Sequence, residues 1–206
     1  MNQPSSYTAF LDSTALFSVF ISNLLLFLSE TDLFRVRWSE HVHAEWIDAR
    51  MRRYPDTNRT ALENKRRQMN TAFPEALVVG YESLIDQFYL PDINDRHVVA
   101  AADKAKADVI ITNNIDDFPE EGLPSGLFAQ TEDDFIVNQF NLTSKSARLV
   151  AIAFVRHKKN LTKSRPTWKQ YFAKLHSILP KTFLSANTAD FRKMIGEILK
   201  ADDWSF

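Results

Sequence analysis

The segment from residue 96 to residue 112 constrains the fold more than any other part of the chain. An alanine-rich helix is predicted from Arg96 to Ala107, and it runs directly into the β-branched stretch Asp108-Val-Ile-Ile-Thr112, which predicts a buried strand. A helix followed closely by a strand is typical of parallel sheets, in which each connection carries the chain back to the starting edge. The chain is therefore expected to form an α/β fold with helices on both faces of a mostly parallel sheet.

Other segments fit the same alternation. Apolar or alternating stretches predict strands at residues 7–11, 34–38, 76–79 and 127–129. Helical patterns predict helices at residues 15–28, 40–53, 59–71, 82–88 and 131–140. Ser39 is positioned to cap the second of these helices, and the Thr131-x-x-Asp134 spacing is that of a capping box.

From Ser144 onward the sequence contains no strand signal. Three amphipathic helices are predicted, around Phe154, Phe172 and Ile195. The charge changes at the same place, because residues 1–144 carry 12 Lys/Arg and 22 Asp/Glu whereas residues 145–206 carry 13 and 4. We therefore predict an α/β domain at residues 1–143 and a basic helical module at residues 144–206, with a surface that attracts polyanions.

Composition excludes several classes of function. The absence of cysteine rules out disulfides, a cysteine nucleophile and thiolate zinc sites, so nothing requires an oxidising compartment. The four glycines are too scattered for a glycine-rich nucleotide loop. The longest uncharged apolar stretch, Ala15–Leu28, has 14 residues and is too short to span a bilayer, and no basic segment precedes it. We expect no membrane association, no targeting segment and a cytoplasmic location.

Acidic residues fall where a parallel sheet places its ligand site, beyond the carboxyl ends of the strands. Asp12 follows the first predicted strand, Asp92 and Asp95 precede the alanine-rich helix, and Asp116 and Asp117 follow the strand that ends at Thr112. Glu45 lies at the margin of the apolar face of its helix.

Clustered carboxylates repel one another unless a cation is present, and all-oxygen ligands suit Mg²⁺ or Mn²⁺. Two structural alternatives stay open at this point. Asp12 and Asp95 are also placed to cap helices, and Glu45 fits a solvated helix surface.

Four blocks of sequence resemble the PIN domain, in particular the branch that contains ribonuclease toxins of the VapC type. The blocks are Phe10-Leu-Asp-Ser-Thr-Ala-Leu16, Trp38-Ser-Glu-His-Val-His-Ala-Glu45, Leu90-Pro-Asp-Ile-Asn-Asp-Arg-His-Val-Val-Ala-Ala-Ala102 and Ala107-Asp-Val-Ile-Ile-Thr-Asn-Asn-Ile-Asp-Asp-Phe-Pro119. The resemblance implies a Rossmann-like α/β/α sandwich and a Mg²⁺- or Mn²⁺-dependent endoribonuclease. It also implies that Asp12, Glu45 and Asp95 are catalytic carboxylates, with Asp12 and Asp95 binding metal.

The fourth carboxylate departs from the family pattern. Many PIN domains carry Thr-x-Asp after the late strand, whereas here Thr112 is followed at that position by Asn114. Either Asp117 or its neighbour Asp116 supplies the charge, or three carboxylates act with Thr112 and Asn114 as neutral oxygen ligands. Ser13 and Asp92 are expected to line the same site.

The resemblance also indicates what the site would act on. Metal ions would hold the scissile phosphate of RNA and lower the pKa of a water for in-line attack, leaving a 5′-phosphate and a 3′-hydroxyl. VapC-type toxins are held inactive by an antitoxin protein, so an antitoxin is expected as partner; a homodimer is left open. Basic residues that could bind RNA phosphates lie in two places: Arg50, Arg52 and Arg53 after Glu45, and Lys158, Lys159 and Lys163 in the tail.

Other functions were weighed against this one. A catalytically inactive PIN-like module that binds RNA or serves as a scaffold is the main alternative, because Asn114 is neutral. A receiver-like phosphoacceptor domain would need an acidic pair after the first strand and a lysine after a late strand, and neither is present. Catalysis by a histidine pair is disfavoured because His41 and His43 lie two residues apart, on different helix faces, and His97 is expected to pack or hydrogen-bond near the site.

Overall fold

The computed structural model describes residues 7 to 200 of the chain. Within this range, residues 7–22 and 34–131 form one compact unit, and residues 23–33 and 132–200 form a second. The predicted domain boundary at residue 144 falls inside the second unit, and residues 201–206 of the predicted module lie outside the described residues.

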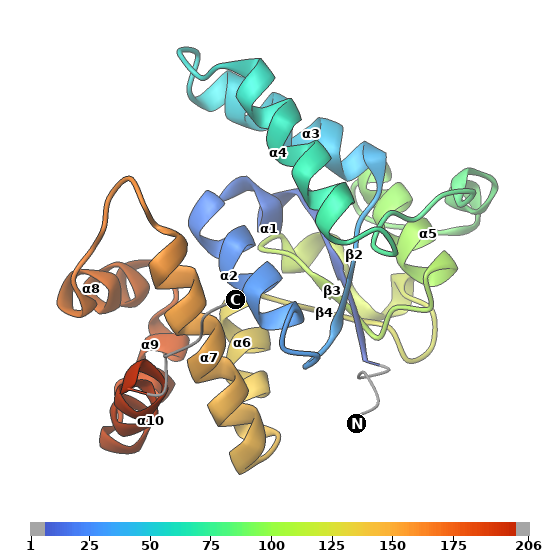
Figure 1. The fold of residues 1–206 in the computed structure, drawn as a ribbon. Helices are drawn as coiled ribbons and strands as arrows, with labels where there is room; N and C mark the ends of the chain where they lie inside the picture. Colours follow the sequence, from blue (N-terminus) through green and yellow to red (C-terminus); the bar gives the residue numbers. More distant parts are fainter. Residues whose placement is uncertain (1–6, 201–206) are drawn as a thin grey trace. The chain divides into compact units, whose positions relative to one another are not determined.

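The first unit is built on a four-stranded parallel sheet in the order β2-β1-β3-β4 (Figure 1). The strands are β1 (Thr8–Leu11), β2 (Arg35–Arg37), β3 (Val109–Ile111) and β4 (Phe128–Gln130). Every residue of β1 and β3 is buried, as expected for central strands covered on both faces. The predicted α/β fold with a parallel sheet is therefore confirmed.

The register of the sheet brings the ends of two strands to the same level. Leu11 pairs with Ile111, and the next backbone amide, that of Asp12, donates to the Ile111 carbonyl at 3.0 Å. On the far side of β3, the amide of Thr112 donates to the Gln130 carbonyl at 2.9 Å. Asp12 and Thr112 therefore lie next to each other at the carboxyl edge of the sheet, although 100 positions separate them in the chain.

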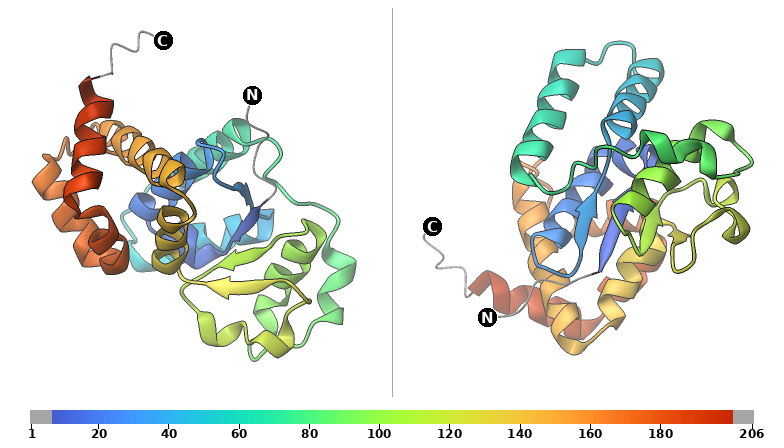
Figure 2. Two further views of the ribbon diagram at one scale, coloured as in Figure 1. Left: turned by 90° about the horizontal axis from the view of Figure 1, so that it is seen from below. Right: turned by 90° about the vertical axis from the view of Figure 1, so that its right-hand side faces the viewer.

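Helices of the first unit connect these strands. They are α1 (Ser13–Phe17), the start of α2 (Val19–Ser29), α3 (Glu40–Arg53), α4 (Arg59–Ala72) and α5 (Arg96–Lys104). Short 3-10 helices follow at η1 (Glu82–Gln87), η2 (Ile93–Asp95), η3 (Ile115–Asp117) and η4 (Glu120–Gly122). Helices α3 and α4 contact each other and form an antiparallel hairpin (Figures 1 and 2).

Two predictions of local structure in the first unit are wrong. The apolar stretch 15–28 is not one helix, because Ser18 adopts an extended conformation and its hydroxyl accepts from the Ile21 amide, which ends α1 and starts α2. Residues 76–79 are not a strand either. They make a single bridge, Leu77 to Trp38, just beyond the end of β2, and Val79 is exposed.

The second unit is helical and has an aromatic core. Besides the end of α2, it contains α6 (Glu132–Asn141), α7 (Ser144–Asn160), α8 (Trp168–Ile178), α9 (Pro180–Ala186) and α10 (Ala189–Lys200). Phe140, Phe154 and Phe191 pack edge-on or tilted against one another, with ring centroids 5.0 to 5.8 Å apart. Helix α9 is unpredicted, because Pro180 begins it at the first helical turn instead of only ending the helix before. Across residues 7–200, none of the helices has the length and apolar character needed to cross a membrane.

Candidate active site

The Asp12 carboxylate is held at the end of β1 by hydroxyl groups from two segments. Its Oδ2 accepts from Thr112 Oγ1 at 2.8 Å, from Thr14 Oγ1 at 2.8 Å and from the Thr14 amide at 3.3 Å. Asp12 is therefore the N-cap of α1, as the structural alternative required, but only 3% of it is exposed and its Oδ1 accepts no hydrogen bond within the described chain. The cap fixes one oxygen and leaves the other available for a ligand.

Thr14 contributes more to this site than the sequence indicated. Its hydroxyl bonds Asp12 and accepts from the Asn113 amide at 3.0 Å, so it ties the turn after β1 to the loop after β3. The predicted site-lining residue was its neighbour Ser13, which is half-buried in the first turn of α1. The signal that could have identified Thr14 is its place two residues after an N-cap aspartate, where a hydroxyl reaches the capping carboxylate.

Asp95 lies among other acids and has a perturbed pKa. Burial raises the pKa of this carboxyl to about 7, helped by the negative charges of Asp12, Asp92, Asp117 and Glu45. Its side chain does not cap α5, so the helix-capping alternative does not hold for Asp95. Capping there is done by Asp92, whose Oδ1 accepts from the Asn94 amide at 2.8 Å and starts η2.

The loop after β3 distinguishes two neighbouring acids. Asp117 is half-buried and its charge acts on Asp95, whereas Asp116 is exposed and does not contribute to the pKa of Asp95. Asn114 lies between them and the strand, and its amide donates to Thr112 Oγ1 at 3.1 Å. The loop is therefore fastened through backbone groups to the hydroxyl that also bonds Asp12.

Glu45 reaches the site from α3 and is held by a histidine of α5. His97 Nε2 lies 2.9 Å from Glu45 Oε1, and only 2% of the His97 side chain is exposed. The expectation that His97 hydrogen-bonds near the site is confirmed. His41, on the same helix as Glu45, stacks on the His97 ring with centroids 3.7 Å apart and planes 16° apart, a contact that the sequence did not reveal.

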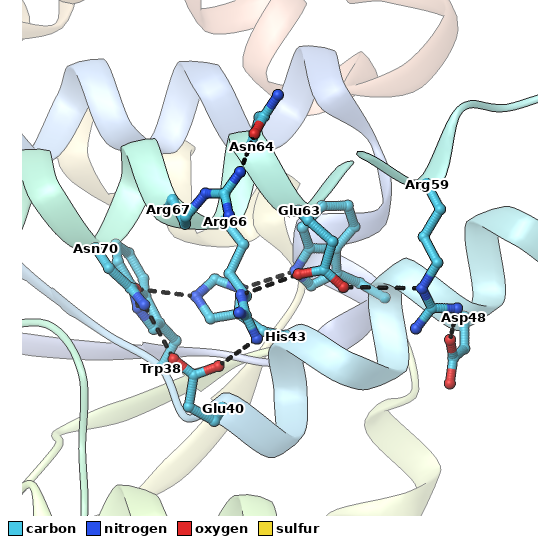
Figure 3. A network of polar contacts seen from close by, with 11 residues as sticks. Trp38, Glu40, His43, Asp48, Arg59, Glu63, Asn64, Arg66, Arg67 and Asn70 are labelled. Carbon is cyan, nitrogen blue, oxygen red and sulfur yellow. Dashed lines mark hydrogen bonds and ion pairs between the residues drawn. The ribbon is translucent and has the colours of Figure 1, made fainter. Parts of the chain in front are cut away.

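The histidine that points the other way from α3 has a structural role. His43 is buried, accepts from Trp46 Nε1 at 2.9 Å through Nδ1, and faces Asn70 Oδ1 with Nε2 at 3.2 Å. Burial lowers its pKa to about 4, so it is neutral in this network (Figure 3). The separation of His41 and His43 onto different faces is as predicted.

Two arginines of the α3–α4 hairpin are paired with acids of the same hairpin. Figure 3 shows Arg66 between Glu40 and Glu63, with nitrogen–oxygen distances of 3.0 and 3.2 Å, and Arg59 next to Asp48 at 3.0 Å. Surface ion pairs of this kind are typical of a solvated helical face and contribute little to stability.

The three arginines predicted to bind RNA differ in how far they are engaged. Arg50 donates to the Phe17 carbonyl at 2.7 Å, and its guanidinium lies over the rings of Phe17 and Tyr54, so it fastens α1 to α3. Arg52 and Arg53 are exposed in the last turn of α3, and Arg53 lies over Tyr54.

The tail lysines also differ from one another. Lys158 is half-buried, with its ammonium 5.1 Å from the ring centre of Trp168, whereas Lys159 and Lys163 are exposed. Lys158 therefore supports packing in the second unit, and the accessible positive charge is carried by its neighbours.

The donor set suits a hard divalent cation. The carboxylates of Asp12, Asp95, Asp117 and Glu45 and the Thr112 hydroxyl offer oxygen ligands only, and the charges of the other three acids add to burial in raising the pKa of Asp95. Mg²⁺ and Mn²⁺ keep several of their own waters, so the side chains need not all touch the ion. The residues at this edge of the sheet therefore fit the predicted cofactor.

Comparison with known proteins finds a similar protein that is named as a ribonuclease. The chain is 36% identical over 81 residues to a protein of Mycobacterium tuberculosis named "Putative ribonuclease VapC50", and the match covers 39% of this chain and 47% of that protein. The chain thus spans about half of its relative. No protein-family model matches the chain. No solved structure matches it either. We call the carboxylates of Asp12, Glu45, Asp95 and Asp117 at this end of the sheet the acidic edge. Together with the parallel α/β fold and the matched protein, the acidic edge supports a partial relationship of this chain to VapC ribonucleases.

Proposed function

We propose that the protein is a divalent-metal-dependent endoribonuclease of the PIN type and the toxin of a toxin–antitoxin pair. The observation that carries the proposal is the gathering of acids from four separate segments around Asp95 at the carboxyl edge of the sheet. The similarity to a protein named as a VapC ribonuclease supports the same reading. A purely structural role would not require acids from separate segments to lie close enough to raise the pKa of Asp95.

The residues divide into ligands and supports. Asp12, through its unused Oδ1, together with Asp95 and Asp117, would hold the cation, and Glu45 would complete the acidic edge. Thr14 and Thr112 fix the orientation of Asp12 through its Oδ2. When bound, Mg²⁺ or Mn²⁺ would supply Lewis-acid activation of the phosphodiester and of the attacking water.

RNA and the antitoxin would bind to basic side chains outside the acidic edge. Arg52 and Arg53 carry accessible charge at the end of α3, and Lys159 and Lys163 carry it in the second unit. Phosphate contacts of this kind give affinity without sequence readout, so the choice of RNA would come from other contacts. The antitoxin is proposed to offer acidic segments to the same basic side chains.

The test is cleavage of RNA by the purified full chain in Mn²⁺, Mg²⁺ or EDTA, with Asp12→Asn as the matched variant. We expect cleavage with either cation, none in EDTA and none with Asp12→Asn, because the substitution keeps the cap but removes the charge. Equal cleavage by the variant would remove Asp12 from the mechanism. RNA binding without cleavage by the parent would instead identify an inactive RNA-binding module.

A further inference from the structure

Three side chains beside the acidic edge form a tighter group than the carboxylates do. His41 Nε2 lies 3.9 Å from Glu45 Oε1, His97 Nε2 lies 2.9 Å from the same oxygen, and one ligand atom from each residue lies within 4.8 Å of the other two. Within residues 7–200, no other set of three histidine or acidic side chains is this close. Two nitrogen donors and one carboxylate oxygen therefore lie close together.

The group is built on two helices in a way that suits a metal. His41 and Glu45 are four residues apart on α3 and so lie on one helix face, and His97 reaches them from α5. Neighbouring ligand atoms of a tetrahedral site with bonds of about 2.0 to 2.2 Å lie roughly 3.3 to 3.6 Å apart. The two nitrogen–oxygen distances bracket this separation, so each needs to change by about half an ångström. The half-exposed His41 ring must also turn out of its stack on His97, because two nearly parallel imidazoles cannot both point a nitrogen lone pair at one ion.

Burial of His97 and exposure of His41 prepare the two imidazoles for such a role. The Nδ1 atom of His97 is buried and has no hydrogen-bond partner in the described part of the chain, so its polar contacts are on the Glu45 side. Burial and the neighbouring His97 lower the pKa of His41 below its ordinary value, with Glu45 opposing, which favours the neutral imidazole that metals bind. About half of the His41 side chain is exposed, which leaves access for a cation and a water ligand.

We propose that His41, Glu45 and His97 form a second metal site, one that takes a transition-metal cation of the Zn²⁺ class. Imidazole nitrogen favours such ions over Mg²⁺, which prefers oxygen ligands. In the tautomer that donates from His97 Nε2 to Glu45 Oε1, binding would move this proton to His97 Nδ1, so that Nε2 presents its lone pair to the metal and His97 stays neutral. Because Glu45 also belongs to the proposed nuclease site, occupancy here would withdraw it from the acidic edge, but the binding itself does not depend on ribonuclease activity.

The experiment uses Co²⁺ as a probe, because tetrahedral Co²⁺ with nitrogen ligands has strong visible absorption whereas octahedral Co²⁺ on carboxylates absorbs weakly. The full chain is titrated with Co²⁺, and Zn²⁺ affinity is then measured by displacement. The variants are His41→Gln, which is at an accessible position, and His97→Gln, which keeps a hydrogen-bond donor to Glu45. His176→Gln, an exposed histidine on α8, is the matched control.

We expect strong absorption in the parent, in His176→Gln and in Asp12→Asn. Loss of an outer-shell partner typically lowers metal affinity by about 10- to 100-fold, so loss of either histidine ligand should lower Zn²⁺ affinity by at least about 100-fold. Weak absorption in the parent would overturn the proposal. It would also be overturned if Asp12→Asn abolished the signal while His41→Gln preserved it, because the probe would then be at the carboxylates. Neither result depends on RNA cleavage, so failure of this site and failure of the proposed function are separable.

Discussion

At the residue scale, the raised pKa of Asp95 predicts how the metal-free protein responds to pH. The carboxyl titrates near 3.8 in the unfolded chain and at about 7 in the folded one, so the folded state binds the proton more tightly. Its contribution to stability is complete below the unfolded pKa and is lost as the pH rises through about 7. Urea unfolding in EDTA should give the parent a lower free energy of unfolding at about pH 8 than at about pH 5. Asp95→Asn should show a smaller difference between the two pH values. Parallel curves for the two proteins would contradict this origin of the decline.

Asp116 and Asp117 offer a matched pair of variants at the residue scale. Asp117→Asn is expected to lower RNA cleavage by about 100-fold, because the lost charge acts on Asp95, whereas Asp116→Asn should stay close to the parent. The measurement is the initial cleavage rate at one saturating concentration of Mn²⁺. If both variants cleave as the parent does, a site of three carboxylates becomes the better description.

Much of this residue-scale picture could be predicted from the sequence, because acids that follow buried strands reach one edge of a parallel sheet. The resemblance supplied the role of Glu45, and the structure places its charge near Asp95. What could not be predicted is set by side-chain direction: Thr14 and not Ser13 reaches Asp12, and His41 stacks on His97 across two helices. Neither contact leaves a periodic signal in the sequence.

At the element scale, Arg50 predicts how α1 and α3 depend on each other. Its guanidinium donates to the last residue of α1 and lies over the rings of Phe17 and Tyr54, so Arg50→Ala should lower the free energy of unfolding by about 1.5 to 3 kcal/mol. The exposed neighbour Arg52 is the control, and Arg52→Ala should change the free energy of unfolding by less than about 0.5 kcal/mol. Denaturant unfolding of both variants measures the difference. Equal values would show that the α1–α3 contact does not depend on this side chain.

The sequence predicted helices and strands well where the hydrophobic pattern and a capping residue indicated the same boundary. It predicted them poorly where a single residue, such as Ser18, ends or starts a helix. Ser39 caps α3 as expected, with its hydroxyl 3.2 Å from the Val42 amide. Ser18 breaks a continuous apolar run, which hydrophobicity alone cannot indicate. Residues 76–79 include two valines, but within residues 7–200 they pair only through an isolated bridge from Leu77 to Trp38, just beyond the end of β2, so tertiary context and not propensity determines their state.

At the scale of the whole molecule, the charge of the chain is unevenly distributed, and this predicts salt-dependent binding. Residues 144–200 carry 13 Lys/Arg and 2 Asp/Glu. The double variant Lys159→Glu with Lys163→Glu should weaken RNA binding and reduce the dependence of its affinity on salt, because fewer counterions are released. Lys158 is left unchanged because it packs over Trp168. The test is to measure RNA binding isotherms across a salt series. If the dependence of affinity on salt is the same in the variant and the parent, residues 144–200 have a structural role only.

The pairing of β1 with β3 also determines when the acidic edge can exist. Asp12 and Thr112 bond each other from positions 100 residues apart, and Asp117 follows still later in the chain. At synthesis rates of about 5 to 20 residues per second, roughly 5 to 20 s pass between the addition of Asp12 and that of Asp117. Until then no local folding of the nascent chain can bring these groups together, because their contact requires closure of a long loop. A ribosome therefore adds about 100 residues after Asp12 before the carboxylates can assemble, and any activity toward RNA begins only after Asp117 has been added.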